Sequence, residues 1–346
     1  GETANSCRLE ECLLKASDMI GWKEKGMRTV MPDGKIRARG VAMAMQGSSI
    51  SNCDVGSVTV KLSDEGTYHI TVGCTDMGTG CDTIIAQFAA DVLETPIDNI
   101  SVYGVDTDIS PYDSGSYASS TTYLTGMAAV KACEQLRERI IALAAVRMNI
   151  DASTLTFDGE NVIDESDGAK MSLFDIATAS MCNNEISLEV TYSHSSPVSP
   201  PPFMAACAEI EADPETGAIE LLDYTACVDC GTVVNTNLAR VQTEGGLLQG
   251  IGMTLYEDIW YDERGKNLSN SFMQYKVPSR LDTDRIRVEF DSSYEPTGPF
   301  GAKSIGEIVI NTPAPAIADA VYNATGVWIN ELPITPEKIL KGMKVI

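Results

Sequence analysis

One acidic residue in this sequence has the neighbours of a candidate general base. Glu307 lies in "GPFGAKSIGEIVINTPAP" (298–315), between Gly306 and a β-branched run at 308–310. A carboxylate set against an apolar wall loses solvation, which strengthens it as a proton acceptor near neutral pH. The alternative is a glutamate at a strand edge facing water, which needs no functional explanation.

Two loops offer polar groups to a ligand. The loop "TDMGTGCDT" (75–83) leads into a helical pattern, and N–H groups at a helix start favour an anion. The alternative is a tight turn with an N-cap. The loop "SPYDSGSYASSTTYLTG" (110–126) carries eight Ser and Thr hydroxyls, which can bind a ligand rich in oxygen without adding positive charge. Its alternative is an extended capping loop in water.

The ten cysteines are scattered without the density of a disulfide framework. The pair Cys227-x-x-Cys230 is either redox-active, half of a zinc site, or two buried thiols. Only His69 and His194 are present in the chain, and no second CxxC follows. Buried thiols are therefore the favoured interpretation.

The elements that position these loops follow one repeated order. Alternating apolar residues predict a hairpin at 56–72, then the loop 75–83, a helix at 83–93 and a strand at 99–105. A second hairpin at 207–228 precedes a polar loop and a Gly-rich helix (246–257), with strands expected near 256–261 and 285–290. The fold class is therefore α+β, with two similar subdomains of hairpin and helix units whose loops converge.

The remaining segments suggest where the subdomains divide. Residues 1–34 predict a helix and a polar linker, 127–148 a long amphipathic helix, and 313–326 a helix that starts after Asn311 and Thr312 and ends at Gly326. The Pro-rich stretch 193–203 favours a boundary near 185–204. We expect a connector at 1–34, a first subdomain at 35–185 and a second at 205–346.

Composition excludes some partners. The chain has 346 residues, with 25 basic and 49 acidic side chains and a net charge of −24, which disfavours nucleic acid and anionic membranes. No run of about 18 apolar residues exists, and the start lacks the features of a signal peptide. We expect a cytoplasmic protein.

Several separated segments together resemble one family. "TDMGTGCDTIIAQFAADVL", "DSGSYASSTTYLTGMAAVKAC", "VNTNLARVQTEGGLLQGIG" and "GAKSIGE" with "PAPAIADAVYNATG" occur in the order found in the molybdenum hydroxylases, the xanthine oxidase family. Within that family the organisation resembles the medium molybdopterin subunit of nicotinate dehydrogenases and bacterial xanthine dehydrogenases. The resemblance implies the second half of a molybdopterin-binding domain, with molybdenum held through its pterin rather than by protein side chains.

The resemblance also implies roles for individual residues. Glu307 matches the catalytic base and Gly306 lies beside the metal site, while Gln242 matches a glutamine that binds the pterin. The loop that passes the metal and holds the pterin is matched by Ala118, Ser119 and Thr121.

Two further segments match with differences. Gly78 and Gly80 match a Gly-Gln-Gly cofactor loop, but Thr79 stands at its middle position, so a hydroxyl would replace the amide. Gln46 and Ile50 match the substrate pocket, where Ile50 replaces a phenylalanine of the aromatic clamp in animal enzymes.

The implied activity is hydroxylation of an N-heterocycle such as nicotinate or a purine with oxygen from water. The implied cofactor is molybdopterin, alone or as its cytosine dinucleotide, with a terminal sulfido or selenido ligand on molybdenum. No iron–sulfur cysteine pattern or flavin segment is present. We therefore expect partners that carry the first half of the molybdopterin-binding region, 2Fe–2S clusters and FAD. Alternatives are a non-catalytic scaffold subunit and an aldehyde-oxidising enzyme.

Overall fold

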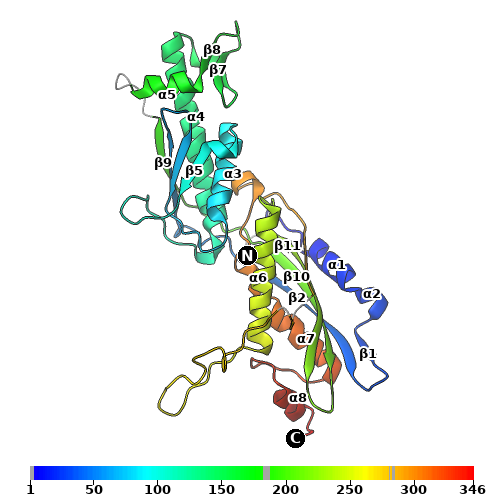
Figure 1. Cartoon of the computed structure of the whole chain (residues 1–346). Coiled ribbons are helices and arrows are strands. Elements are labelled where there is room, and N and C mark those ends of the chain that lie inside the picture. Colours follow the sequence, from blue (N-terminus) through cyan, green and yellow to red (C-terminus); the bar gives the residue numbers. More distant parts are fainter. Residues whose placement is uncertain (1–3, 182–187, 280, 283–284) are drawn as a thin grey trace. The chain divides into compact units, whose positions relative to one another are not determined.

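The chain forms two compact units (Figure 1). The computed structural model describes residues 4–181, 188–279, 281–282 and 285–346. Unit 1 consists of Gly1–Gln46, Pro201–Glu295 and Ile305–Ile346, and unit 2 of Gly47–Pro200 and Pro296–Ser304.

Unit 1 is built on a five-stranded sheet in the order β1-β2-β10-β11-β12. Every neighbouring pair is antiparallel except β11 and β12, which are parallel. The strands are β1 (Arg28–Val30), β2 (Ile36–Met45), β10 (Phe203–Ala212), β11 (Ile219–Asp229) and β12 (Ile286–Phe290).

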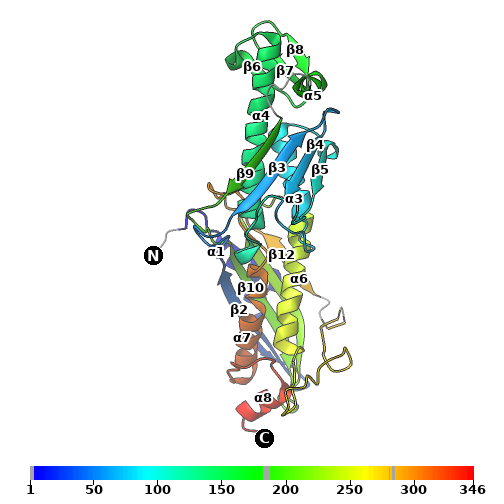
Figure 2. The same ribbon diagram turned by 90° about the vertical axis from the view of Figure 1, so that its left-hand side faces the viewer.

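Helices cover both faces of this sheet. On one face, α6 and α7 pack over an apolar core that includes Ile210, Val228 and Ile317. On the other face, Cys12 and Ala16 of α1 pack against the sheet. Figure 2 shows α6 and α7 side by side along the strands. The helices are α1 (Leu9–Ile20), α2 (Trp22–Lys25), α6 (Thr236–Leu255), the 3₁₀ helix η6 (Ile308–Ile310), α7 (Pro313–Thr325) and α8 (Pro336–Gly342).

Unit 2 has a four-stranded sheet, β5-β4-β3-β9, and a three-stranded sheet, β6-β7-β8. Its strands are β3 (Gly56–Leu62), β4 (Tyr68–Val72), β5 (Ile100–Tyr103), β6 (Leu155–Phe157), β7 (Asn161–Asp164), β8 (Lys170–Ser172) and β9 (Glu189–His194). Its helices are α3 (Cys81–Leu93), α4 (Gly126–Met148) and α5 (Leu173–Met181), with short helices η1 (Ile97–Asn99), η2 (Tyr117–Ser119), η3 (Thr121–Thr125), η4 (Ala152–Thr154) and η5 (Pro299–Gly301).

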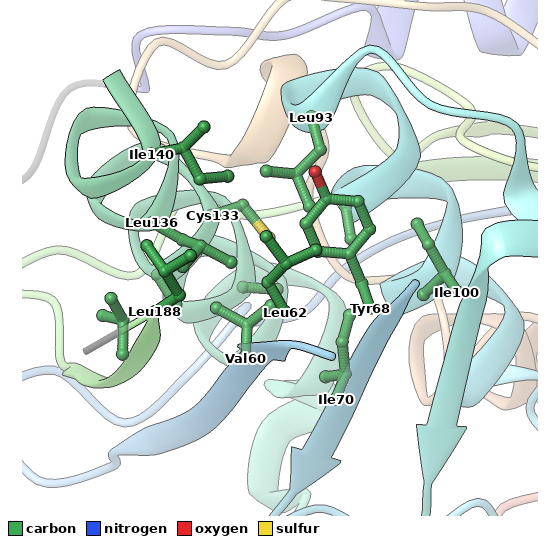
Figure 3. Close-up of a cluster of buried hydrophobic side chains, with 14 of the residues drawn as sticks. Val60, Leu62, Tyr68, Ile70, Leu93, Ile100, Cys133, Leu136, Ile140 and Leu188 are labelled. Carbon is green, nitrogen blue, oxygen red and sulfur yellow. The ribbon is translucent and has the colours of Figure 1, made fainter. Parts of the chain in front are cut away.

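The apolar core of unit 2 lies between its four-stranded sheet and helices α3 and α4. Ile70 and Val60 of the sheet meet Leu136 and Ile140 of α4 there (Figure 3). The hydroxyl of Tyr68 points into this cluster. Because the sheet presents every second residue to the helices, the alternation at 56–72 determined which side chains enter the core.

The α+β fold with two similar subdomains is confirmed by the strand topology. In unit 2 the hairpin β3–β4 is followed by α3, then by β5 parallel to β4, then by α4. In unit 1 the hairpin β10–β11 is followed by α6, then by β12 parallel to β11, then by α7. A fourth strand pairs antiparallel with the first hairpin strand in each unit, β9 with β3 and β2 with β10.

The units divide the chain differently from the expected 1–34, 35–185 and 205–346. Strand β2 pairs with β10 over its whole length, so 35–46 joins the residues after 200 rather than the first subdomain. Residues before 35 form no separate connector, because α1 buries Cys12, Ala16 and Ile20 against the unit 1 sheet. The expected boundary at 185–204 contains the observed division at Pro200, although 182–187 lie outside the described residues.

One predicted strand is absent from the described chain. Near 256–261 only an isolated bridge between Tyr261 and Asn267 forms, because α6 continues to Leu255 and the segment finds no neighbouring strand. The helix at 313–326 is confirmed, with Gly326 in a left-handed conformation at its end. No helix of the described residues has both the length and the apolar character needed to cross a membrane.

Candidate functional site

The residues that the sequence pointed to fall into two groups, one in each unit. Unit 1 contains Gln46, Gln242, Gly306 and Glu307. Unit 2 contains Ile50, Gly78, Thr79, Gly80, Ala118, Ser119 and Thr121.

Glu307 immediately precedes η6, a single 3₁₀ turn rather than the expected short strand. This turn directs Ile308 and Val309 into the core of unit 1, where both are buried. Glu307 itself is exposed in this chain. The expected apolar wall is therefore not formed around the carboxylate, because its apolar neighbours face the sheet and α6 instead.

A small amide network holds the Glu307 side chain. Gln46, directly after β2, donates from Nε2 to Glu307 Oε2 at 3.1 Å. Asn311, one turn after Glu307, donates from Nδ2 to Gln46 Oε1 at 3.4 Å. Among the residues that the structure describes, no cation pairs with Glu307, and its Oε1 atom has no hydrogen-bond partner.

Asn311 was not identified as a site residue from the sequence, where it was assigned to the start of the next helix. Thr312 occupies the N-cap position by its backbone, but its side chain makes no capping bond. Its hydroxyl instead accepts a hydrogen bond from Tyr224 at 3.0 Å. The spacing of four residues between Glu307 and Asn311, about one helical turn, was the available signal.

Two glycines of α6 set the position of η6. A Cβ at Gly246 would lie 2.2 Å from Val309 Cγ2, and one at Gly250 would lie 2.6 Å from Pro313 Cγ. The missing side chains therefore allow α6 to approach η6 and the start of α7 closely. Gln242 lies one turn before Gly246, is half-buried, and makes no side-chain hydrogen bond within the described ranges.

In the glycine loop of unit 2 (75–83), backbone N–H groups donate to an aspartate of the same loop. Asp76 Oδ1 accepts from the N–H groups of Gly78 at 2.9 Å and Gly80 at 3.1 Å. Partial burial raises the pKa of Asp76, but bonds from the N–H groups of Gly80, Gly78, Asp82 and Thr79 outweigh this and leave the pKa below its ordinary value. The N–H groups expected to face an anion are therefore largely bonded to a carboxylate of the same chain, and the Thr79 side chain is half-buried.

The second loop has a strained backbone. Ala118 and Ser119 are consecutive non-glycine residues with positive φ, 47° and 59°. A single π-helical segment, η3, follows at once and leads into α4. Both features are uncommon, cost energy, and occur frequently at functional sites.

Within this loop, Ser119 provides a test of whether a ligand fits. Its Oγ atom is buried and has no hydrogen-bond partner among the described residues. By contrast, the Thr121 hydroxyl already bonds with Ser116 at 2.7 Å. An orphaned buried hydroxyl normally has an ion, water or ligand as its partner, so Ser119 fits a group rich in oxygen such as a pterin cofactor.

The loop after Gln46 is fixed by serine side chains. Ser199 Oγ accepts from the N–H groups of Ser48 at 3.0 Å and Ser49 at 3.2 Å. The Ile50 N–H donates to Asp54 at 2.7 Å, while the Ile50 side chain is 49% exposed. Ile50 therefore presents an apolar surface from an anchored backbone.

The CxxC motif does not form a site. Cys227 packs with Cys12 and Cys207 under α1, whereas Cys230 belongs to the core on the opposite face of the sheet. Strand alternation separates the two thiols, so neither a redox pair nor half of a zinc site results. Of the described cysteines only Cys7 and Cys53 are exposed, and Cys182 lies outside the described residues.

Comparison with known proteins gives a consistent assignment. Residues 15–284 match the molybdopterin cofactor-binding domain family. The chain is 38% identical over 346 residues to a protein named probable hypoxanthine oxidase XdhD from Escherichia coli (strain K12), covering 99% of this chain and 36% of the relative. It is 31% identical over 335 residues to the 6-hydroxypseudooxynicotine dehydrogenase complex subunit gamma of Paenarthrobacter nicotinovorans, covering 94% of this chain and 42% of the relative.

A solved structure has the same fold. The structure of quinoline 2-oxidoreductase from Pseudomonas putida 86 superposes with a TM-score of 0.89 at 24% identity, over 99% of this chain and 47% of that one. The chain thus spans less than half the length of these relatives.

Proposed function

Because this chain belongs to the molybdopterin cofactor-binding domain family of the molybdenum hydroxylases, we propose that it supplies the catalytic base and part of the cofactor site of such an enzyme. The proposed reaction inserts oxygen from water at an electron-poor carbon of an N-heterocycle. The names of the relatives support this substrate class, since one refers to hypoxanthine and the other to 6-hydroxypseudooxynicotine.

The cofactor and the chain have separate tasks in this proposal. When bound, molybdenum on its pterin supplies a Lewis acid and a two-electron acceptor. Ala118, Ser119 and Thr121 would hold the pterin, with the Thr79 hydroxyl as a further contact. The resemblance to the family gives Gln242 a pterin-binding role as well. Support comes from the buried Ser119 hydroxyl, which has no hydrogen-bond partner in the described part of the chain.

Glu307 accepts the proton that the reaction releases, next to Gly306. The observation that carries this step is a carboxylate with one oxygen held by Gln46 and the other without a partner. A carboxylate neutralised in an ion pair would be a weaker base, and no cation of the described residues pairs with this one. Because Glu307 is exposed in this chain, exclusion of water falls to the remainder of the enzyme.

The same proposal implies partners. We propose that a subunit or segment corresponding to the first half of the molybdopterin-binding region completes the cofactor site, and that further subunits carry 2Fe–2S clusters and FAD to remove electrons. The cofactor form remains molybdopterin or its cytosine dinucleotide, with a sulfido or selenido ligand.

The Glu307→Gln variant tests this function in the purified holoenzyme. We expect hydroxylation of hypoxanthine, xanthine and nicotinate to fall by a factor of about 10²–10⁴, because general base catalysis contributes about that much. Molybdenum and pterin content should stay at the wild-type level, as measured by metal analysis and fluorescence of the oxidised pterin.

Glu337→Gln is the matched control, since Glu337 is an exposed glutamate in the first turn of α8. It should retain full turnover. An active Glu307→Gln enzyme would refute the assignment of the base, and a wild-type complex without molybdenum would support a scaffold subunit instead.

A further inference from the structure

The amide network at Glu307 joins residues that are distant in sequence. Gln46 and Glu307 are 261 positions apart, and their side chains meet at 3.1 Å. Asn311 reaches the same glutamine from the other side at 3.4 Å. The three side chains form a chain of donors that ends on one carboxylate oxygen, Oε2.

The chemistry of the groups fixes the orientation of the Gln46 amide. A carboxylate has no hydrogen to donate, so Gln46 must present its NH₂ group to Glu307. Its carbonyl oxygen then faces away and can accept from Asn311. The Asn311 bond thus selects the amide orientation that Glu307 requires.

Both ends of this network are attached to well-packed elements. Gln46 follows β2, whose last residue, Met45, is still in register with Phe203 of β10. Glu307 and Asn311 flank η6, which is anchored by buried Ile308 and Val309. Fixed backbones on both sides reduce the entropy that is lost when the side chains hold one geometry.

We propose that Gln46, oriented by Asn311, is a positioning residue that holds Oε2 of Glu307 and leaves Oε1 as the atom that receives the proton. This inference rests on the proposed function, since it takes Glu307 as the base. It assigns Gln46 to the base rather than to substrate contact, which was the role expected from the sequence. Loss of the amide would let the carboxylate rotate, so that neither oxygen keeps the reactive position.

The inference predicts a change in turnover more than in substrate affinity. In the holoenzyme, Gln46→Ala should lower kcat about tenfold, the effect of losing one hydrogen bond to a charged group, with KM changed less than about twofold. Asn311→Ala should lower kcat in the same direction by a smaller factor, about threefold. A residue that contacts substrate would instead change KM, and by different factors for hypoxanthine and nicotinate.

A second variant tests the contact without turnover. Gln46→Glu keeps the shape but places two carboxylates at hydrogen-bond distance, where they share a proton. Infrared titration should reveal a carboxyl C=O band that Glu307→Gln removes, and Gln46→Glu should shift the pH of its appearance upward by about one unit or more. The acidic limb of the rate profile should move by the same amount.

Gln135→Glu, with the same change of charge on α4, is the control and should leave the band and the rate profile in place. If Gln46→Glu leaves both in place, or if Gln46→Ala changes only KM, the positioning role is refuted. Full activity of Glu307→Gln would be a different result, because it would refute the proposed function itself.

Discussion

Among the described residues three buried hydroxyls, those of Ser49, Tyr68 and Ser119, have no hydrogen-bond partner, and the last two differ in their surroundings. Tyr68 Oη lies in the apolar core of unit 2 beside Leu93 (Figure 3), where burial raises the pKa of the phenol. Ser119 Oγ lies in a polar loop with strained backbone. The Tyr68 hydroxyl lies among apolar side chains that offer a polar ligand no binding site. The Ser119 hydroxyl lies in the loop that we propose binds the cofactor.

We predict that Ser119→Ala and Tyr68→Phe affect folding alike and cofactor binding differently. Each variant removes a hydroxyl that is buried without a partner, so each should leave the free energy of unfolding unchanged or raise it by about 1 kcal/mol. Only Ser119→Ala should lower the molybdenum and pterin content of the purified complex. Denaturant titration and metal analysis measure the two effects, and a clear loss of folding stability in Ser119→Ala would mean that the hydroxyl has a structural partner.

At the scale of elements, the position of Glu307 depends on the contact between α6 and η6. Gly246 allows this contact, since a Cβ there would collide with buried Val309. A Cβ at the adjacent Gly245 would have no other heavy atom within 4 Å. The sequence "TEGGLLQGIG" therefore contains one glycine that packing requires next to one that it does not.

We predict opposite effects of alanine at these neighbouring positions of α6. Gly246→Ala should lower the free energy of unfolding by about 1–3 kcal/mol through overpacking, and should also reduce turnover because η6 shifts. Gly245→Ala should raise the free energy of unfolding by about 0.5–1 kcal/mol, because alanine favours a helix over glycine. Urea titrations of both variants measure the difference. An unchanged free energy of unfolding in Gly246→Ala would show that η6 can move away from α6 without loss of stability.

On the surface of unit 1, one segment exposes several large apolar side chains. Between α6 and β12, Phe272 is 80% exposed and Met273 is 81% exposed. Leu281 of the same segment is 96% exposed. Because the chain spans less than half the length of the relatives described above, we propose that the partner with the first half of the molybdopterin-binding region covers this segment.

We predict that Phe272→Ser with Met273→Ser weakens association with that partner by a factor of about 10 or more, since exposed aromatic anchors dominate interface energies. Folding of the chain alone should be unaffected, because neither side chain contributes to a core. Sedimentation of the mixed subunits measures the association. Phe174→Ser on α5, where the phenylalanine is 58% exposed, is the control and should not change it. If the double variant associates as strongly as the wild-type chain, this segment is not the partner's binding surface.

Features that depend on neighbouring residues could be predicted from the amino-acid sequence. Alternation at 56–72 and 207–228 gave the two hairpins, helical spacing gave α4 and α7, and local motifs identified the family and the loops at 75–83 and 110–126. These features follow from periodicity and from turn and cap chemistry, which act over a few residues.

Contacts between residues far apart in the sequence could be found only in the folded chain. Pairing of β2 with β10 moved 35–46 into unit 1 and brought Gln46 to Glu307, and the turn at η6 exposed the carboxylate while burying Ile308. The sequence also did not predict that Asp76 accepts hydrogen bonds from the glycine-loop N–H groups. Nor did it predict that the Ser119 hydroxyl is buried without a partner among the described residues. Such contacts depend on strand register and helix packing between segments up to 261 positions apart, and no local pattern encodes that choice.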